Sequence, residues 1–351
     1  EFSAGTLCNI GNFFKDIGKI SYGIEHFSKA IKAEPNHAEA HWNLSLCLLL
    51  DANFELGWQQ YEWRWESIGI NTPRLETAKP EWHPGEKGRV LLWPEQGLGD
   101  EIMFCSILSE LHSQADSVIV QTDKRLVQLF QRSFPQDVKF VPREQTVKEE
   151  DYDLHIPMGS LPRVFRPTLE SFEIGAKKFF KADSKRAENL RSKLLDEGCD
   201  KLIGISWHST AKRSLAQEKA MSLEQLAKTL NKPGTKLISL QYGDVSKEIA
   251  DLKNTTGITV TEVSEIDNYN DIDGLAALIE ACDEVVSISN VTVHIAGALG
   301  KPVKILLASS CDWRWGSKQD YSYWYQDAKL YRQSEINNWE NVLNMLATGN
   351  F

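Results

Sequence analysis

The stretch RVLLWPEQGLGDEIMFCSILSELH, residues 89–112, decides the fold of this chain. It opens with an apolar run, continues through Pro94, Gly97 and Gly99, and ends in apolar residues at helical spacing. This order predicts a buried strand, a tight glycine loop and a helix over 101–112. Such a loop brings backbone N–H groups and the positive end of a helix to the carboxyl end of a strand, where α/β proteins bind their ligands.

Asp100 lies in this loop and has two interpretations. Asp is a preferred N-cap residue, and the periodic segment begins directly after it. A carboxylate held beside glycines can also approach a substrate hydroxyl and act as a general base, with Glu95 and Glu101 as alternatives. A dinucleotide-binding loop is excluded, because Ile102 stands where G-x-G-x-x-G requires its third glycine.

Composition limits the classes of function. The 351 residues permit two or three domains, and the formal net charge of −10 without a basic stripe argues against nucleic acid as a partner. The six cysteines lack the short spacing of a metal or redox site, so we expect buried thiols, a cytoplasmic protein and no structural metal. No run of about 18 apolar residues and no leader is visible, so we expect neither a membrane span nor a signal peptide.

An internal repeat occupies the first 65 residues. Residues that superpose at a separation of 34 are Asn9 with Asn43, Gly23 with Gly57 and Phe27 with Tyr61. The pattern resembles the tetratricopeptide repeat, a helix–turn–helix unit of that period, although Arg64 replaces the small residue found at Ala30. About three repeats are usually needed for a stable stack, so these two must extend a longer array or dock on the next domain.

Three aromatic residues, Trp58, Tyr61 and Trp65, share one helical face, while Trp63 points elsewhere. This face can pack against the following domain or form a groove for a peptide or protein partner. A proline- and glycine-rich linker anchored by Trp82 follows.

Strands and helices then alternate in two successive units, which predicts βαβ connections and mostly parallel sheets. The first unit has strands expected at 117–121, 138–141 and 154–156, with a helix at 123–133. A helix at about 177–197 leaves it. The second unit has strands expected at 201–207, 236–241 and 284–288, with helices at 222–230 and 272–282.

The segment SNVTVHIAGALGKPV follows the last of these strands. Asn290 is placed to cap a helix whose first turn offers Thr292 and His294, which together with the helix terminus can hold a diphosphate. Alternatively, His294 is a satisfied helix histidine and Thr292 an extra cap. The tryptophans of DWRW, 312–315, can stack on a base or sugar beside a phosphate-binding Arg314, or anchor the C-terminal tail to the sheet.

The chain resembles glycosyltransferase family 9 in four segments that occur in the expected order. They are EQGLGD, ISW followed by a basic loop, SLQYG, and SNVTVHIAGALGKPV with DWRW after it. Family 9 is the family of the ADP-heptose:lipopolysaccharide heptosyltransferases, and the chain is most similar to bacterial members fused to tetratricopeptide repeats. The resemblance implies an α/β GT-B fold of two Rossmann-like domains after an all-α repeat segment, with the last helix crossing back to the first domain. The implied divisions are 1–68 repeats, 69–88 linker, 89–180 acceptor domain, 181–335 donor domain and 336–351 crossover helix.

The resemblance implies an inverting, metal-independent transferase of the hexosyl or heptosyl type without a cofactor. It makes Asp100 the base in an acceptor-side loop with Gln96, Gly97 and Gly99. The donor-diphosphate segment that it implies comprises Asn290, Thr292, His294 and Gly297, and the implied cation is Lys212, Arg213 or Lys219. We also expect the donor to be bound by Trp207, His208, Ser209, Gln241, Tyr242, Ser289, Asp312, Trp313 and Arg314. Lipopolysaccharide members often carry Asp where this chain has Ser289, which argues against heptose as the sugar.

Three functions fit these observations. The first is transfer of a sugar from a nucleotide-sugar to a glycan or glycolipid hydroxyl. The second is transfer to a protein acceptor presented by the repeats, because such repeats bind peptides in their concave groove. The third is a non-catalytic scaffold, against which Asp100 and the intact glycine loops count.

Overall fold

The computed structural model describes residues 2–68, 72–173, 178–209 and 220–349. It divides into two compact units. Unit 1 comprises Glu1–Lys124, Pro135–Ala176 and Ser310–Trp324. Unit 2 comprises Arg125–Phe134, Lys177–Ser309 and Tyr325–Phe351.

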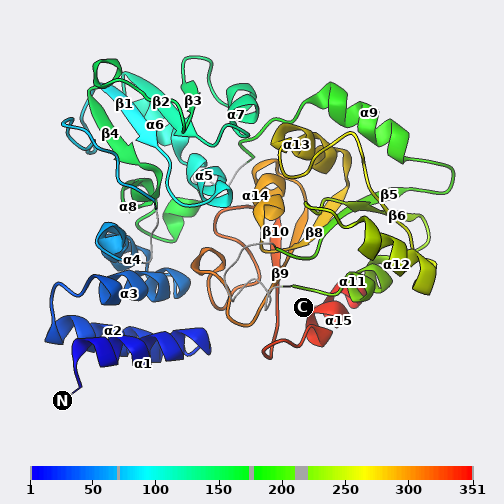
Figure 1. Ribbon diagram of the computed structural model, residues 1–351, viewed down its shortest axis with the longest axis horizontal. Coiled ribbons are helices and arrows are strands. Elements are labelled where there is room, and N and C mark those ends of the chain that lie inside the picture. The colour runs from blue at the N-terminus through cyan, green and yellow to red at the C-terminus, as the bar shows by residue number, and fades with distance from the viewer. Residues whose placement is uncertain (1, 69–71, 174–177, 210–219, 350–351) are drawn as a thin grey trace. The chain divides into compact units, whose positions relative to one another are not determined.

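Unit 1 begins with a helical segment in which each helix packs against the next (Figure 1). Its elements are α1 Ala4–Asp16, α2 Ile20–Ala33, α3 Ala38–Leu50, α4 Phe54–Tyr61 and the 3₁₀ turn η1 Glu62–Trp65. Gly57 permits close packing of α4, because a Cβ there would lie 3.3 Å from the backbone nitrogen of Leu49. The helices form as expected, and their assignment to the tetratricopeptide repeat remains a prediction.

A parallel four-stranded sheet of order β3-β2-β1-β4 completes unit 1. Its strands are β1 Arg89–Trp93, β2 Ser117–Thr122, β3 Lys139–Pro142 and β4 Leu154–Pro157. The remaining helices of unit 1 are α5 Leu98–Cys105, α6 Leu108–Gln114, α8 Leu161–Phe165 and the 3₁₀ turns η2 Glu149–Asp151, η3 Met158–Ser160, η4 Glu170–Phe172 and η5 Trp313–Trp315. The single helix predicted over 101–112 is wrong, since the chain breaks after α5, where the hydroxyl of Ser106 donates to the carbonyl of Met103.

Unit 2 holds a parallel six-stranded sheet of order β10-β9-β8-β5-β6-β7 (Figure 1). Its strands are β5 Lys201–Ser206, β6 Thr235–Ser239, β7 Val260–Thr261, β8 Glu284–Ile288, β9 Val303–Leu307 and β10 Ala328–Arg332. Its helices are α7 Val127–Ser133, α9 Ser184–Leu194, α11 Leu223–Leu230, α12 Ser246–Thr256, α13 Ile272–Ala281, α14 Val291–Ala298 and α15 Glu340–Thr348. The two parallel-sheet α/β domains expected from the alternating pattern are therefore confirmed.

Two segments pack differently from the expectation. The resemblance implied a last helix that crosses back to the first domain, whereas Val342 and Leu346 of α15 join the hydrophobic core of unit 2. Ser310–Trp324 belongs to unit 1, although it falls within the predicted donor domain 181–335. Among the helices of the described ranges, none combines the length and the hydropathy that crossing a bilayer requires.

Candidate functional site

The glycine loop after β1 places Asp100 in the first turn of α5 rather than before it. Gly97, in an extended conformation, is the N-cap, and Oδ2 of Asp100 accepts a hydrogen bond of 3.1 Å from its N–H. The prediction that Asp100 is the N-cap is therefore wrong. A carboxylate in the first turn can satisfy the N–H of the cap residue and complements the helix dipole, which explains its position.

Arg314 of η5 contacts the other oxygen of Asp100 and also pairs with Asp312. The guanidinium lies over the ring of Trp313, 4.7 Å from its centroid. Burial alone would lower the pKa of Arg314, but the Asp100 and Asp312 carboxylates raise it above its usual value. Arg314, predicted to bind the donor, thus contacts the candidate base within unit 1.

Glu95 and Arg64 form a fully buried ion pair beneath the loop. Oε2 of Glu95 lies 2.7 Å from Nε of Arg64, and Oε1 lies 2.9 Å from Nη2. The N–H of Gly159 also donates to Oε1, at 2.7 Å. Sequence reasoning missed this contact; its only signal was the arginine that breaks the repeat pattern.

Glu101 is also buried. It accepts hydrogen bonds from the hydroxyl of Thr122 and the N–H of Asp123, and pairs with Arg143. The side chains of Glu95 and Glu101 are 0% exposed, so neither can reach a bound hydroxyl, whereas Asp100 keeps 13% exposure despite its pair with Arg314. Asp100 remains the candidate base of this loop.

The aromatic face of α4 packs against the rest of unit 1. Nε1 of Trp58 donates to the carbonyl of Arg166, and the Trp58 ring packs edge-on against Trp313. Trp65 contacts Trp93 with ring centroids 5.1 Å apart. The packing interpretation of this face is confirmed.

The tryptophans of DWRW are buried as well. Trp313 packs against Tyr61, with ring centroids 5.8 Å apart, and Trp315 is fully buried. η5 contacts α3 of the helical segment. Both tryptophans are buried, as the anchoring interpretation expected, but Trp313 packs against the helical segment rather than against a sheet.

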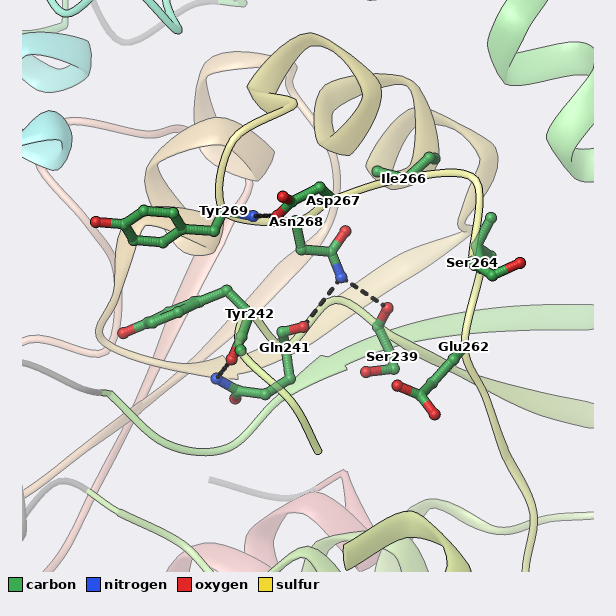
Figure 2. Close-up of a pocket in the computed structure, with 11 residues that line it drawn as sticks. Ser239, Gln241, Tyr242, Glu262, Ser264, Ile266, Asp267, Asn268 and Tyr269 are labelled. Carbon is green, nitrogen blue, oxygen red and sulfur yellow. Dashed lines mark hydrogen bonds between the residues drawn. The ribbon is translucent and has the colours of Figure 1, made fainter. Parts of the chain in front are cut away.

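Unit 2 contains a pocket of about 700 Å³ beyond the carboxyl ends of β6 and β7. Figure 2 shows Tyr242 and Tyr269 at one end and Glu262 and Ser264 at the other. The tyrosine ring centroids lie 6.1 Å apart. The side-chain amide of Asn268 donates to the carbonyl of Gln241 and holds the pocket loop on the sheet (Figure 2).

Gln241 connects this pocket to the loop after β5. Its Oε1 accepts hydrogen bonds from the Ser206 hydroxyl at 3.0 Å and from the N–H groups of Trp207 and His208 at 2.9 and 3.1 Å. Trp207 is buried, and its indole N–H donates to Glu248. Gln241 lines the pocket, and its side chain links the pocket to Trp207 and His208, which lie outside the lining.

The same network reaches the N-terminus of α14. Nδ2 of Asn290 donates to the Ser206 hydroxyl at 2.7 Å, and its Oδ1 accepts from the N–H of Thr292 at 3.0 Å. The predicted cap is confirmed. Within the described residues, Oγ1 of Thr292 is buried without a hydrogen-bond partner, so its hydrogen-bonding capacity is unused in this structure.

His294 and Gly297 serve packing around Tyr325. Nδ1 of His294 lies 2.8 Å from the Tyr325 hydroxyl, and the side chain is buried. A Cβ at Gly297 would collide with the ring of Tyr325. This contact agrees with the interpretation of His294 as a satisfied helix histidine, and its role toward the donor stays a prediction.

Three other predicted donor residues, Ser209, Tyr242 and Ser289, also lie in unit 2. The Tyr242 hydroxyl donates to Ser209 at 3.2 Å, and Ser289 lies partly exposed between β8 and α14. Lys212, Arg213 and Lys219 lie outside the described residues. Across the described ranges, no group of three His, Cys, Asp or Glu side chains is arranged to hold a metal ion.

Comparison with known proteins gives the fold a context. No family model matches the chain. It is 28% identical over 311 residues to protein FlbA of Caulobacter vibrioides, a match that covers 83% of this chain and 51% of FlbA. The chain thus spans about half the length of this curated relative.

Two solved structures share the fold. A family 9 glycosyl transferase from Veillonella parvula superposes with a TM-score of 0.52 at 12% identity, over 72% of this chain and 87% of that one. The ADP-heptose lps heptosyltransferase II of E. coli superposes with a TM-score of 0.51 at 13% identity, over 74% of this chain and 99% of that one. The two α/β domains therefore have the GT-B-like fold of family 9 glycosyltransferase structures.

Proposed function

We propose that this chain is an inverting, metal-independent glycosyltransferase that moves a sugar from a nucleotide-sugar to a hydroxyl of a glycan or glycolipid. The GT-B-like fold supports a glycosyltransferase. Because fold alone does not establish function, the proposal depends on the chemistry of the two sites.

The observation that carries it is the hydrogen-bonded chain from the pocket wall to α14, through Gln241, Ser206 and Asn290. It joins a pocket with aromatic walls to a helix N-terminus at one edge of the sheet. A ligand that fits both has an uncharged, flat part and an anionic part. A nucleoside diphosphate has this chemistry.

The charges favour a different position for each part of that ligand. Among the described residues that line the pocket, none is Lys or Arg, and the carboxylates of Glu262 and Asp267 would repel phosphate. The pocket therefore suits the nucleoside. The N-terminus of α14, with the N–H groups of its first turn and the Thr292 hydroxyl, suits the diphosphate.

Departure of the nucleoside diphosphate builds negative charge that a metal-free enzyme must meet with hydrogen-bond donors and cations. The proposed cation is Lys212, Arg213 or Lys219. In unit 1, Asp100 is the proposed base: the acceptor oxygen bonds to the anomeric carbon, the bond to the diphosphate breaks, and the acceptor proton passes to the carboxylate. Gln96, Gly97 and Gly99 shape the loop around it.

We propose the acceptor by its chemical class and the nucleotide as a first candidate to test. Burial of Trp58 and Tyr61 removes the aromatic groove that would have favoured a peptide acceptor, so a glycan or glycolipid is preferred. The E. coli structure is that of an ADP-heptose enzyme, which makes ADP the first nucleotide to test. Ser289 argues against heptose as the transferred sugar.

Calorimetry of the full chain with ADP, GDP, UDP and CMP tests the proposal. We expect one of these nucleotides to bind more tightly than its nucleoside, with an affinity that excess EDTA leaves unchanged. An affinity that collapses in EDTA would show that a metal is required, and no binding of any nucleotide would contradict a nucleotide-sugar donor.

A further inference from the structure

We infer that Tyr61 and Arg64 of the helical segment are positioning residues for the loop 94–100, so that these helices form part of the framework that orients Asp100. The inference rests on the proposed role of Asp100. It assigns the helices a task inside the enzyme rather than partner binding alone.

Arg64 fixes the first acidic residue of the loop. Its guanidinium binds both oxygens of Glu95, donates to the Ser160 hydroxyl at 2.9 Å, and contacts Glu62. Arg64 and Glu95 are 0% exposed. A fully buried, bidentate pair holds one geometry, because movement of either partner would leave a charge uncompensated.

Tyr61 fixes the next residue. Gln96 has a φ of 60°, a left-handed conformation that is unfavourable for a residue other than glycine. Its side-chain amide donates to the Tyr61 hydroxyl at 2.5 Å, and its N–H donates to the Thr72 hydroxyl at 3.0 Å. Contacts from outside the loop therefore hold this strained residue in place.

Tyr61 also contacts the second segment that binds Asp100. Its ring packs against Trp313, the residue before Arg314. Burial raises the pKa of Tyr61, so its hydroxyl stays protonated. One side chain of α4 thus touches both the glycine loop and η5, whose Arg314 pairs with Asp100.

The consequence concerns the rate of transfer. A general base must lie within hydrogen-bond reach of the acceptor proton, and a displacement of about 1 Å can slow a reaction by about 10²-fold. Loosening the loop should therefore slow transfer, while donor binding in unit 2 persists.

The test compares Tyr61→Phe with Tyr152→Phe in the full chain. Tyr152 is a matched control, because it lies buried in the same unit and its hydroxyl donates to Thr77 at 2.9 Å, away from the loop. We expect hydrogen exchange of the 94–100 amides to be about tenfold faster in Tyr61→Phe and unchanged in the control. With a sugar nucleotide that turns over, kcat should fall about 10- to 100-fold with an unchanged donor Kd.

Gln96→Met removes the same hydrogen bond from its less buried partner and must produce the same increase in exchange if Tyr61→Phe does not fold. Unchanged protection of 94–100 in Gln96→Met, or equal changes in Tyr61→Phe and Tyr152→Phe, would overturn the inference. Failure of the proposed function would give a different result. The parent chain would then turn over no sugar nucleotide, while faster exchange of the 94–100 amides in Tyr61→Phe would still support positioning of the loop.

Discussion

The guanidinium of Arg314 donates to the carboxylate of Asp100, although the two residues are 214 positions apart in the sequence. The N–H of Gly97 donates to the other carboxylate oxygen. Two donors from separate segments therefore orient Asp100. A proposed base that is held in this way depends on contacts that lie outside its own loop.

Breaking the buried pair of Arg64 and Glu95 should destabilise unit 1 strongly. Arg64→Met leaves Glu95 buried without its partner, so we expect the free energy of unfolding to fall by about 3–5 kcal/mol in urea denaturation. Arg64→Met combined with Glu95→Gln should cost clearly less, because no charge is then stranded. Arg89→Met is the control: its pair with Asp153 is about half exposed, so its loss should cost less than about 1 kcal/mol. A loss below about 1 kcal/mol for Arg64→Met would contradict this account.

The sequence predicted the two sheets because their central strands are continuous apolar runs. Val90, Leu91 and Leu92 of β1 are 0% exposed, and β8 begins and ends where the pattern placed it. The start of α5 was missed because Gly97, rather than an oxygen-bearing side chain, is the cap. The pairing of Arg64 with Glu95 could not be predicted, since it joins a helix and a loop that only the folded chain brings together.

At the candidate site, local contacts could be predicted from the sequence, whereas contacts between distant segments could not. The Asn290 cap is a local interaction over two residues, so sequence spacing was sufficient. Arg314 was assigned to the donor because an arginine between two tryptophans can contact a phosphate beside a stacked base, whereas Ser310–Trp324 packs in unit 1. The unit in which this segment packs depends on the surface that Trp313 and Trp315 contact. Residue spacing does not reveal that surface.

Thr292→Val tests the diphosphate position better than a change at His294, which would disturb Tyr325. Valine keeps the shape and removes a buried hydroxyl that has no partner in the described part of the chain, so stability should hold or rise. Nucleoside diphosphate affinity should fall about tenfold or more, and nucleoside affinity should stay the same. Thr229→Val, whose exposed hydroxyl bonds to Gln225, is the control for calorimetry. Equal losses for both ligands would remove Thr292 from the phosphate site.

His155 should give the fold a defined pH dependence. Burial lowers its pKa below the ordinary value of 6.5, and Nδ1 accepts a hydrogen bond from the Trp93 indole. As the pH falls through about 6.5, the unfolded chain binds a proton that the folded chain resists, so stability is present above that pH and is lost below it. Unfolding measured from about pH 8 to about pH 5 should show a smaller loss for His155→Gln. A loss identical to that of the parent chain would exclude His155 as its source, and His83→Gln, at an exposed histidine, is the control.

Asp100→Asn tests the central claim most directly. Asn has one acceptor oxygen, so its amide nitrogen must face either the Gly97 N–H or Arg314, and we expect a stability loss of about 1–3 kcal/mol. Arg314→Gln breaks the same contact from the other side and keeps the carboxylate, which makes it the matched control.

The decisive measurement is the rate of sugar transfer by Asp100→Asn and Arg314→Gln, with the nucleotide-sugar identified by calorimetry. If Asp100 is the base, Asp100→Asn binds the donor as the parent does and transfers about 10²–10⁴-fold more slowly, while Arg314→Gln loses at least about tenfold less. An Asp100→Asn chain that binds the donor and transfers at the parent rate would contradict the account and leave Asp100 as a structural partner of Arg314.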